Sequence, residues 1–160
     1  MKKIGEYTCK GSYIPDGGFN LDNPRRISLF DGRFDTGYRI VEFYVWGKGI
    51  EPGQDNDVLG LLSTENDNRN QFFRAESNIQ IAWASNRGAT FADVNALQKG
   101  IVDPDNMVIE DLYLYGFAGD QGTSHVNYMI VMEKYKFSKA YGALTMVRNK
   151  SQGSDAFPRQ

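Results

Sequence analysis

The stretch from Met107 to Phe137 places the strongest constraint on what this chain can fold into. It contains two runs of alternating apolar residues, MVIEDLYLYGF and HVNYMIVMEKYKF, separated by the connection AGDQGTS. A period of two is typical of β-strands, and two such runs around a turn predict a long β-hairpin at the centre of a sheet. The stretch therefore indicates an architecture, but it carries no recognisable chemistry.

The segment RRISLFDGRFDTGYRIVEFYVW, residues 25–46, repeats this pattern nearer the N-terminus. Asp31-Gly32 is a tight-turn dipeptide, so the runs on either side of it predict a second hairpin. A glycine inside a strand is typical of a bulge, which is what we expect at Gly60. Further strands are expected at residues 3–14 (an edge strand), 57–64 and 77–84.

Seven or eight strands separated by turn signals predict an all-β fold, an antiparallel β-sandwich with jelly-roll-like topology rather than a closed barrel. The 160 residues are enough for one core, and we expect a single domain over residues 1–150. Ser138 is a candidate N-cap for one short C-terminal helix, with the edge strand ALTMVRN as the alternative. Residues 151–160 are expected to be a flexible tail or an arm that contacts a neighbour.

Charge and hydropathy exclude several classes of protein. The chain has 18 basic and 20 acidic residues and no polybasic run, so we expect neither specific nucleic-acid binding nor attraction to a membrane surface. No apolar run approaches the length that spans a bilayer, and the start MKKIGEYTCKGSY lacks the apolar core of a signal peptide. We therefore expect no membrane insertion.

Residues suited to catalysis or metal binding are scarce. The chain has one His and one Cys, so a His-rich metal site is excluded, and we expect no cofactor and no catalytic residue. Ser124 and His125 are adjacent, and consecutive strand residues point to opposite faces, so they do not form a triad. Cys9 is expected to be a small apolar residue in the first strand. The acidic turns at 55–57 and 103–106 resemble calcium loops but lack the EF-hand pattern, and we leave calcium binding open.

The aromatic residues of the 107–137 stretch lie on both faces of its predicted strands. Tyr113, Tyr115 and Phe117 form one stripe of the first run, opposite Leu112 and Leu114. A strand of a monomeric sandwich needs only one apolar face, so the second must be covered by a loop, a helix or another subunit. Burial of both faces within one chain would remove this argument for assembly. Candidate assembly or packing residues are Tyr113, Tyr115, Phe117 and, in the second run, Tyr128.

Two segments carry a resemblance to a known group of proteins. They are RRISLFDGRFDTGYRIVEFYVW and the region from IVDPDNMVIEDLYLYGF to ALTMVRNKSQ, with the markers LFDGRFDTG and VNYMIVMEKYKFS. The chain resembles small single-domain β-rich structural proteins of virus particles, known from viral and environmental viral genomes. The resemblance implies a jelly-roll-like sandwich that assembles with copies of itself or with other virion proteins, and it carries over no functional residues.

The expected function is therefore that of a non-enzymatic structural subunit of a virus particle: a capsid, penton, decoration or tail-associated protein. Such a protein is made in the host cytoplasm and resides in the virion. The alternative is a carbohydrate-binding β-sandwich in which Trp46 and Trp83 stack on sugar rings, although buried tryptophans are commoner. A hydrolase or isomerase on the same fold is the third possibility, and the single His argues against its metal-dependent form.

Overall fold

A computed structural model describes residues 1–15, 24–47, 58–67, 70, 72–86, 99–118 and 125–146. These residues form eight strands and, at residues 139–146, one short helix. The predicted acidic turn at 55–57, Ser124 and the tail at 151–160 lie outside the described residues. The strands are β1 (Lys2–Tyr13), β2 (Arg25–Ser28), β3 (Thr36–Gly47), β4 (Val58–Ser63), β5 (Gln80–Asn86), β6 (Ile101–Val102), β7 (Asp111–Ala118) and β8 (Val126–Lys136).

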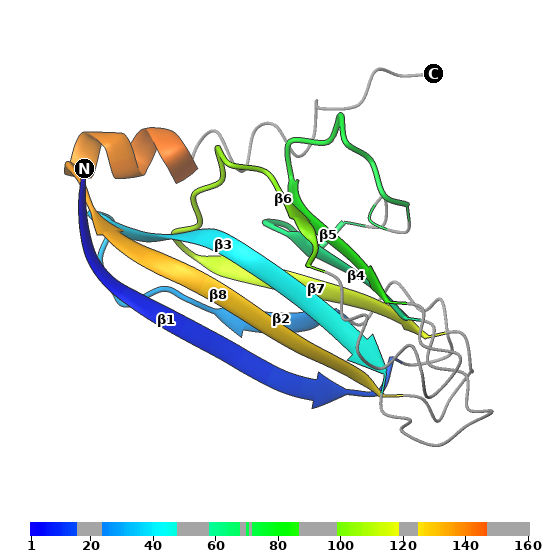
Figure 1. Ribbon diagram of the computed structural model, residues 1–160. Helices are drawn as coiled ribbons and strands as arrows, with labels where there is room; N and C mark the ends of the chain where they lie inside the picture. Colours follow the sequence, from blue (N-terminus) through cyan, green and yellow to red (C-terminus); the bar gives the residue numbers. More distant parts are fainter. Residues whose placement is uncertain are drawn as a thin grey trace.

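The strands form two antiparallel sheets that pack face to face, so the predicted all-β sandwich is confirmed (Figure 1). One sheet has three strands in the order β1-β8-β3, and the other has five in the order β2-β7-β4-β5-β6. Alternate residues of β3 and β8 meet alternate residues of β4, β5 and β7 in one continuous apolar core. At its centre lie side chains with no exposed surface, among them Phe43, Ile130, Leu62, Leu112 and Leu114.

The strand order is that of a jelly roll. The first strand pairs with the last, the second with the next to last, and the fourth with the fifth, as in a long hairpin folded over on itself. The remaining pair of this pattern, β3 with β6, is reduced to a contact: the Gly100 amide just before β6 donates to the Phe43 carbonyl at 2.8 Å, while β6 itself pairs with β5. The jelly-roll-like topology expected from the sequence is thus present.

Both predicted hairpins are wrong. β7 and β8 are consecutive in the chain but belong to different sheets, and so do β2 and β3. The turn at Asp31-Gly32 does form: Gly32 has a φ of 85°, and the Asp31 carboxylate accepts a hydrogen bond from the Arg33 amide. It carries the chain from one sheet to the other, because each strand finds its partner at the opposite end of the sequence.

Gly60 is not a bulge, contrary to the sequence-based expectation. The irregularity of the β4–β5 pair lies between Leu62 and Ser63, and a separate bulge in β3 lies between Ile40 and Glu42. Gly60 instead makes room for the opposing sheet, since a Cβ there would lie 2.4 Å from Cγ1 of Val45. Its neighbour across the ladder, Gly116, similarly leaves space for the Tyr13 ring of β1.

The predicted C-terminal helix is confirmed, and the edge-strand alternative for this segment is wrong within residues 139–146. Ser138 is its N-cap, because Oγ of Ser138 accepts a hydrogen bond from the Tyr141 amide at 3.1 Å. Gly142 lets the helix approach the backbone carbonyl of Phe34, where any side chain would collide. The helix packs on a small cluster at one end of the sandwich, formed by Met107, Ile109, Phe137, Tyr135 and Met146.

Candidate functional site

The outer face of the five-stranded sheet is covered by the chain's own β4–β5 connection. Tyr115, Leu61 and Trp83 form one row across β7, β4 and β5 on this face, behind the core. Tyr115 is only 2% exposed because residues 66–67 lie over it. Its hydroxyl donates to Oδ1 of Asn66 at 2.7 Å and accepts from the Asp67 amide at 3.0 Å, and burial raises the pKa of this phenol. The chain itself therefore covers this aromatic face at Tyr115.

Gln80 fastens the rest of the covering connection. Its side chain is 1% exposed, yet all four of its hydrogen-bonding positions are used. Nε2 donates to the Phe72 carbonyl at 2.8 Å and to Oδ1 of Asn70 at 3.3 Å. Oε1 accepts from the Arg74 amide at 2.7 Å and from the Trp83 indole at 2.9 Å. One buried amide thus holds several points of the connection onto the sheet.

The stripe Tyr113, Tyr115 and Phe117 consequently lies on the outer face of the five-stranded sheet, with Tyr115 and Phe117 buried and Tyr113 half-buried. Tyr128, from β8, lies in the central core with 3% of its surface exposed. For β7, both faces are packed within one chain. The sequence-based argument for assembly from this strand therefore fails, and these residues serve packing.

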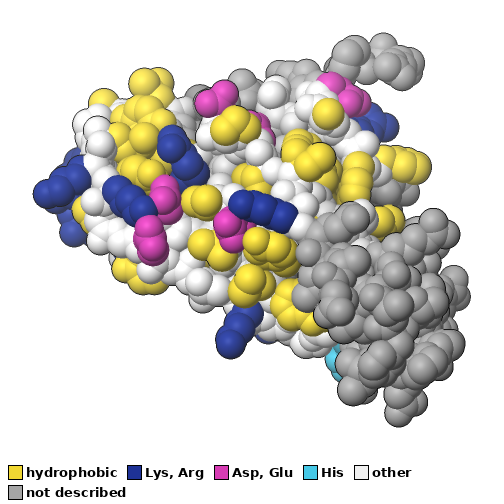
Figure 2. Space-filling view, in the orientation of Figure 1, with side chains coloured by type: hydrophobic (Ala, Val, Ile, Leu, Met, Phe, Trp, Pro, Cys, Tyr) yellow, Lys and Arg dark blue, Asp and Glu magenta, His cyan; other side chains and the backbone are white. Residues whose placement is uncertain are grey.

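The outer face of the three-stranded sheet differs. It carries rows of residues across β1, β8 and β3, with Met129 and Val131 of β8 at the centre and Tyr44 beside Met129, all half-buried. Val41, at the β3 bulge, is 38% exposed. Within the described residues no segment folds across this face as the β4–β5 connection does across the other (Figure 1). Figure 2 shows hydrophobic side chains interspersed with charged ones on this side of the molecule.

Ion pairs border this face on both sides. On the β1 side, Nζ of Lys3 contacts the carboxylate of Glu133 at 2.6 Å and also that of Glu6. Hydrogen bonds from Lys3 and then from Tyr135 lower the pKa of Glu133. On the β3 side, Lys99 contacts Glu42 at 2.9 Å and lowers its pKa, with a further hydrogen bond from Tyr44. An apolar centre with a charged border is an arrangement common to protein interfaces.

The two edges of the three-stranded sheet are also unequal. Along β3, the segment that follows β5 occupies the edge: Val108 exchanges two backbone hydrogen bonds with Tyr38, and the buried Asn106 amide bonds both the N–H and the C=O of Ile40. Among the described strands, β1 pairs only with β8, on one side and over nearly its whole length. Figure 1 shows β1 at the margin of the molecule. The predicted edge strand is thus confirmed.

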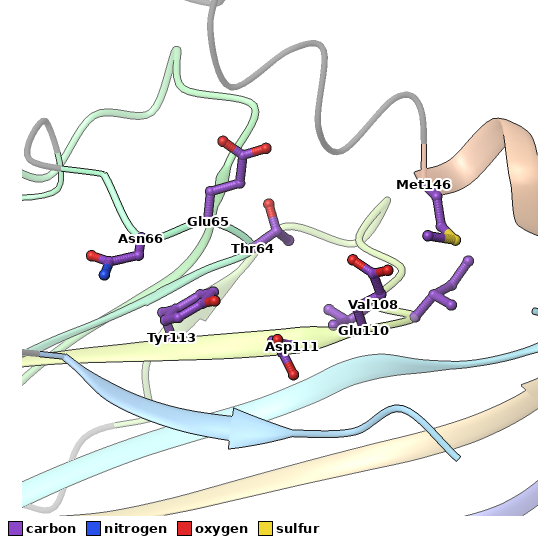
Figure 3. Close-up of a pocket in the computed structure, with 9 residues that line it drawn as sticks. Thr64, Glu65, Asn66, Val108, Glu110, Asp111, Tyr113 and Met146 are labelled. Carbon is purple, nitrogen blue, oxygen red and sulfur yellow. The ribbon is translucent and has the colours of Figure 1, made fainter. Parts of the chain in front are cut away.

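A pocket of about 330 Å³ lies between the β4–β5 connection, the start of β7 and the C-terminal helix (Figure 3). Its lining is acidic, with Glu65, Glu110 and Asp111, and Asp111 is engaged by Arg26 at 2.8 Å. The lining also holds the hydroxyls of Thr64 and Tyr113, and it contains no His, Cys, Lys or Arg. Among the described residues, no group of His, Cys, Asp and Glu is arranged to hold a metal ion.

Cys9 and His125 are not brought together. Cys9 pairs with Ile130 on β8, and His125 is five residues back along that strand, which is about 16 Å. Cys9 is half-buried against the core, and burial raises the pKa of its thiol, as fits a packing residue. In the turn at 103–106, the Asn106 side chain points into the fold toward β3.

The two tryptophans lie on opposite sides of the sandwich. Trp46 is half-buried on the outer face of the three-stranded sheet, opposite Asn127 of β8. Trp83 packs against the sealed cluster of the other sheet, and its indole is bonded to Gln80. They do not form one surface for sugar rings.

Comparison of the chain with protein-family models, with curated proteins and with solved structures finds no match. In the part of the chain that the structure describes, no helix is long and apolar enough to cross a membrane.

Proposed function

We propose that this protein is a non-enzymatic structural subunit of a virus particle, which resides in the virion and works by assembling with copies of itself or with other virion proteins. The jelly roll is one of the folds of viral capsid proteins, although lectins and cupins share it, so the fold alone does not decide. The resemblance of the 25–46 and 101–152 segments to virion proteins points in the same direction.

The outer face of the three-stranded sheet carries the proposal. The chain covers one apolar outer face with its own connection, but it leaves Met129, Val131 and Val41 accessible on the other. Apolar centres bordered by charged groups suit contacts that form between subunits, and many weak contacts suffice in a closed particle because they act together.

The test combines incorporation into particles with a surface variant. The full chain should be present in many copies per particle when virions are purified and quantified by mass spectrometry. Val131→Glu places a charge in the centre of the face and should reduce incorporation about tenfold or more. Ile101→Glu is the matched control, because Ile101 is 72% exposed on the other sheet and should tolerate the change. Absence of the chain from purified particles would reject the proposal.

A carbohydrate-binding module is the second candidate, favoured by one observation. Trp46 and Tyr44 lie two residues apart on the same outer face of β3, where aromatic rings can stack on sugars. Glycan-array binding that is lost in Trp46→Ala but retained in Val131→Glu would support this function over assembly. Trp83 is not part of this surface, since it belongs to the sealed face.

A further inference from the structure

The long open edge of β1 raises the question of what pairs with it. An edge strand presents a row of unpaired N–H and C=O groups, and proteins usually shorten, charge or cover such edges. The other described edges follow this rule: β3 is covered by residues 100–108, β2 has four residues with two arginines, and β6 has two residues. β1 has twelve residues and contains no proline.

We propose that β1 pairs with β1 of a second copy, antiparallel and about a two-fold axis at Thr8, to join two three-stranded sheets into one of six strands. An edge strand that recruits another strand gains backbone hydrogen bonds over its length. The proposal deepens the proposed function, because it names a second copy of this chain as the partner in assembly.

The register follows from alternation and charge. When two antiparallel copies are related by a two-fold axis perpendicular to the sheet, each residue lies opposite a residue whose side chain is on the same face. Because side chains alternate between the faces, the axis must lie at a residue and not between two residues. Centring on Thr8 places Glu6 opposite Lys10 of the second copy, twice by symmetry, on the outer face. Opposite charges directly across an antiparallel pair are favourable, and like charges are unfavourable.

Other centres between Gly5 and Gly11 lack this match. Centring on Glu6 opposes Glu6 to its own copy, and centring on Lys10 opposes two lysines. Centring on Tyr7 or Cys9 leaves Glu6 and Lys10 opposite uncharged side chains. Centring on Gly5 or Gly11 leaves one of the two opposite an uncharged side chain and the other beyond the end of the partner strand. The sequence of β1 is therefore self-complementary about Thr8 alone in this range.

The side chains concerned are accessible for such a contact. Glu6, Thr8 and Lys10 are exposed, and Tyr7, on the opposite face, is 49% exposed at the same edge. Glu6 already contacts Lys3 of its own strand, so pairing with Lys10 of the second copy would extend an existing ion pair rather than create a new buried charge.

A charge-swap series tests the pairing in the full-length protein. Sedimentation of the wild-type chain should show a concentration-dependent dimer. Glu6→Lys and Lys10→Glu should each weaken the dimer about tenfold, because two like-charge pairs replace two attractive ones, and the double variant E6K/K10E should restore it. Lys2→Glu, outside the matched pair, is the control. A monomer at all concentrations, or a double variant as weak as the singles, would overturn the proposal.

A cross-linking experiment tests the register independently of any loss of fold. In a Cys9→Ala background, Thr8→Cys places two thiols on the axis, where opposed Cβ atoms are close enough for a disulfide under mild oxidation. Thr8→Cys should form a covalent dimer at least tenfold faster than Glu6→Cys or Lys10→Cys; equal rates would overturn the register. Dimer formation together with absence from virions would support this inference and reject the proposed function. Incorporation of a strictly monomeric chain into virions would support the proposed function and reject this inference.

Discussion

The two outer faces of this sandwich carry similar apolar residues, but the chain covers one of them and leaves the other open. On the five-stranded sheet, the β4–β5 connection lies over Tyr115 and is fastened by Gln80, so an aromatic face becomes a second small core. On the three-stranded sheet, Met129 and Val131 stay half-exposed between two ion-paired borders. The cover on the first face relies on neutral hydrogen bonds, whereas the second face is framed by charges.

This difference shows that a strand with two apolar faces is no evidence of assembly by itself. β7 and β8 both have such faces, yet the chain buries Tyr115 and Phe117 on the outer face of β7 and leaves the outer face of β8 open. What separates the two cases is the presence of a connection long and polar enough to cross the sheet and bond to it. An interface is therefore best sought where no such connection reaches.

The largest contrast is expected between two tyrosines. Tyr115→Ala should lower the free energy of unfolding by roughly 3 kcal/mol or more, because it empties a buried aromatic site. Tyr44→Ala, on the open face, should cost about 0.5 kcal/mol or less. Urea unfolding of both variants measures the difference. Equal costs would mean that both faces are covered to the same extent.

Gln80→Leu tests the fastening of the cover. Removing the amide leaves the Arg74 N–H and the Phe72 carbonyl without their partner, and the expected cost is about 2 kcal/mol. Hydrogen exchange of residues 72–79 should become faster, while that of β8 stays slow. Asn127→Leu is the matched control, since that amide makes one bond, to the Gly47 carbonyl, at the end of the open face. If exchange does not change in the Gln80 variant, the connection is held by other contacts.

Gly142→Ala tests the docking of the C-terminal helix against the turn that leads into β3. Alanine favours helix by up to about 1 kcal/mol over glycine, but its Cβ would collide with the Phe34 carbonyl. The collision should prevail, with a net loss of about 1–3 kcal/mol. Proteolysis within 139–146 should accelerate, whereas Ala143→Gln, at an exposed helix position, should leave it unchanged. A stabilised Gly142 variant would show that the helix is not docked.

The smallest expected effect is on the pH dependence of stability. The ion pairs that border the open face contribute to this dependence, whereas the neutral hydrogen bonds of the β4–β5 connection do not. Lys3 lowers the folded-state pKa of Glu133, so its contribution to stability is present above the unfolded value of about 4.3 and is lost as pH falls through the folded value. Melting temperatures between pH 6 and 2 should therefore fall slightly less steeply in Glu133→Gln. Lys3→Met should flatten the curve by a smaller amount, because the Tyr135 hydroxyl still donates to Glu133, and the double variant should add nothing beyond Glu133→Gln. An undiminished slope in all three variants would show that this ion pair does not contribute.

Most of the secondary structure could be predicted from the sequence, but the pairing of strands could not. Alternation located β3, β7 and β8 and separated their two faces, because that pattern is local. The same pattern gave two hairpins that do not exist, since adjacency in sequence says nothing about which sheet a strand enters. The jelly-roll-like topology was predicted correctly, although this topology places the two strands of each predicted hairpin in different sheets.

The cover over β7 was missed because the polar run ENDNRNQ, residues 65–71, has no periodic pattern that predicts where it packs. One signal was available: Gln80 stands beside Ile79 and Ile81 in an apolar run, and a glutamine in such a place must find partners. Gly60 was similarly misread as a bulge, and Gly142 gave no signal of its role in the helix. Both instead permit close approach of another element, which no local pattern reveals.

The pairing of β1 with β8 also has a consequence for synthesis of the chain. Lys2 pairs with Lys136, so β1 leaves the ribosome roughly ten seconds before its partner β8 has been synthesised, at usual elongation rates. Until then neither β1 nor β3 has its ladder partner, because β8 lies between them. A chain that stops before β8 therefore loses the whole three-stranded sheet, and only a chain that includes β8 presents the surface on which assembly would depend.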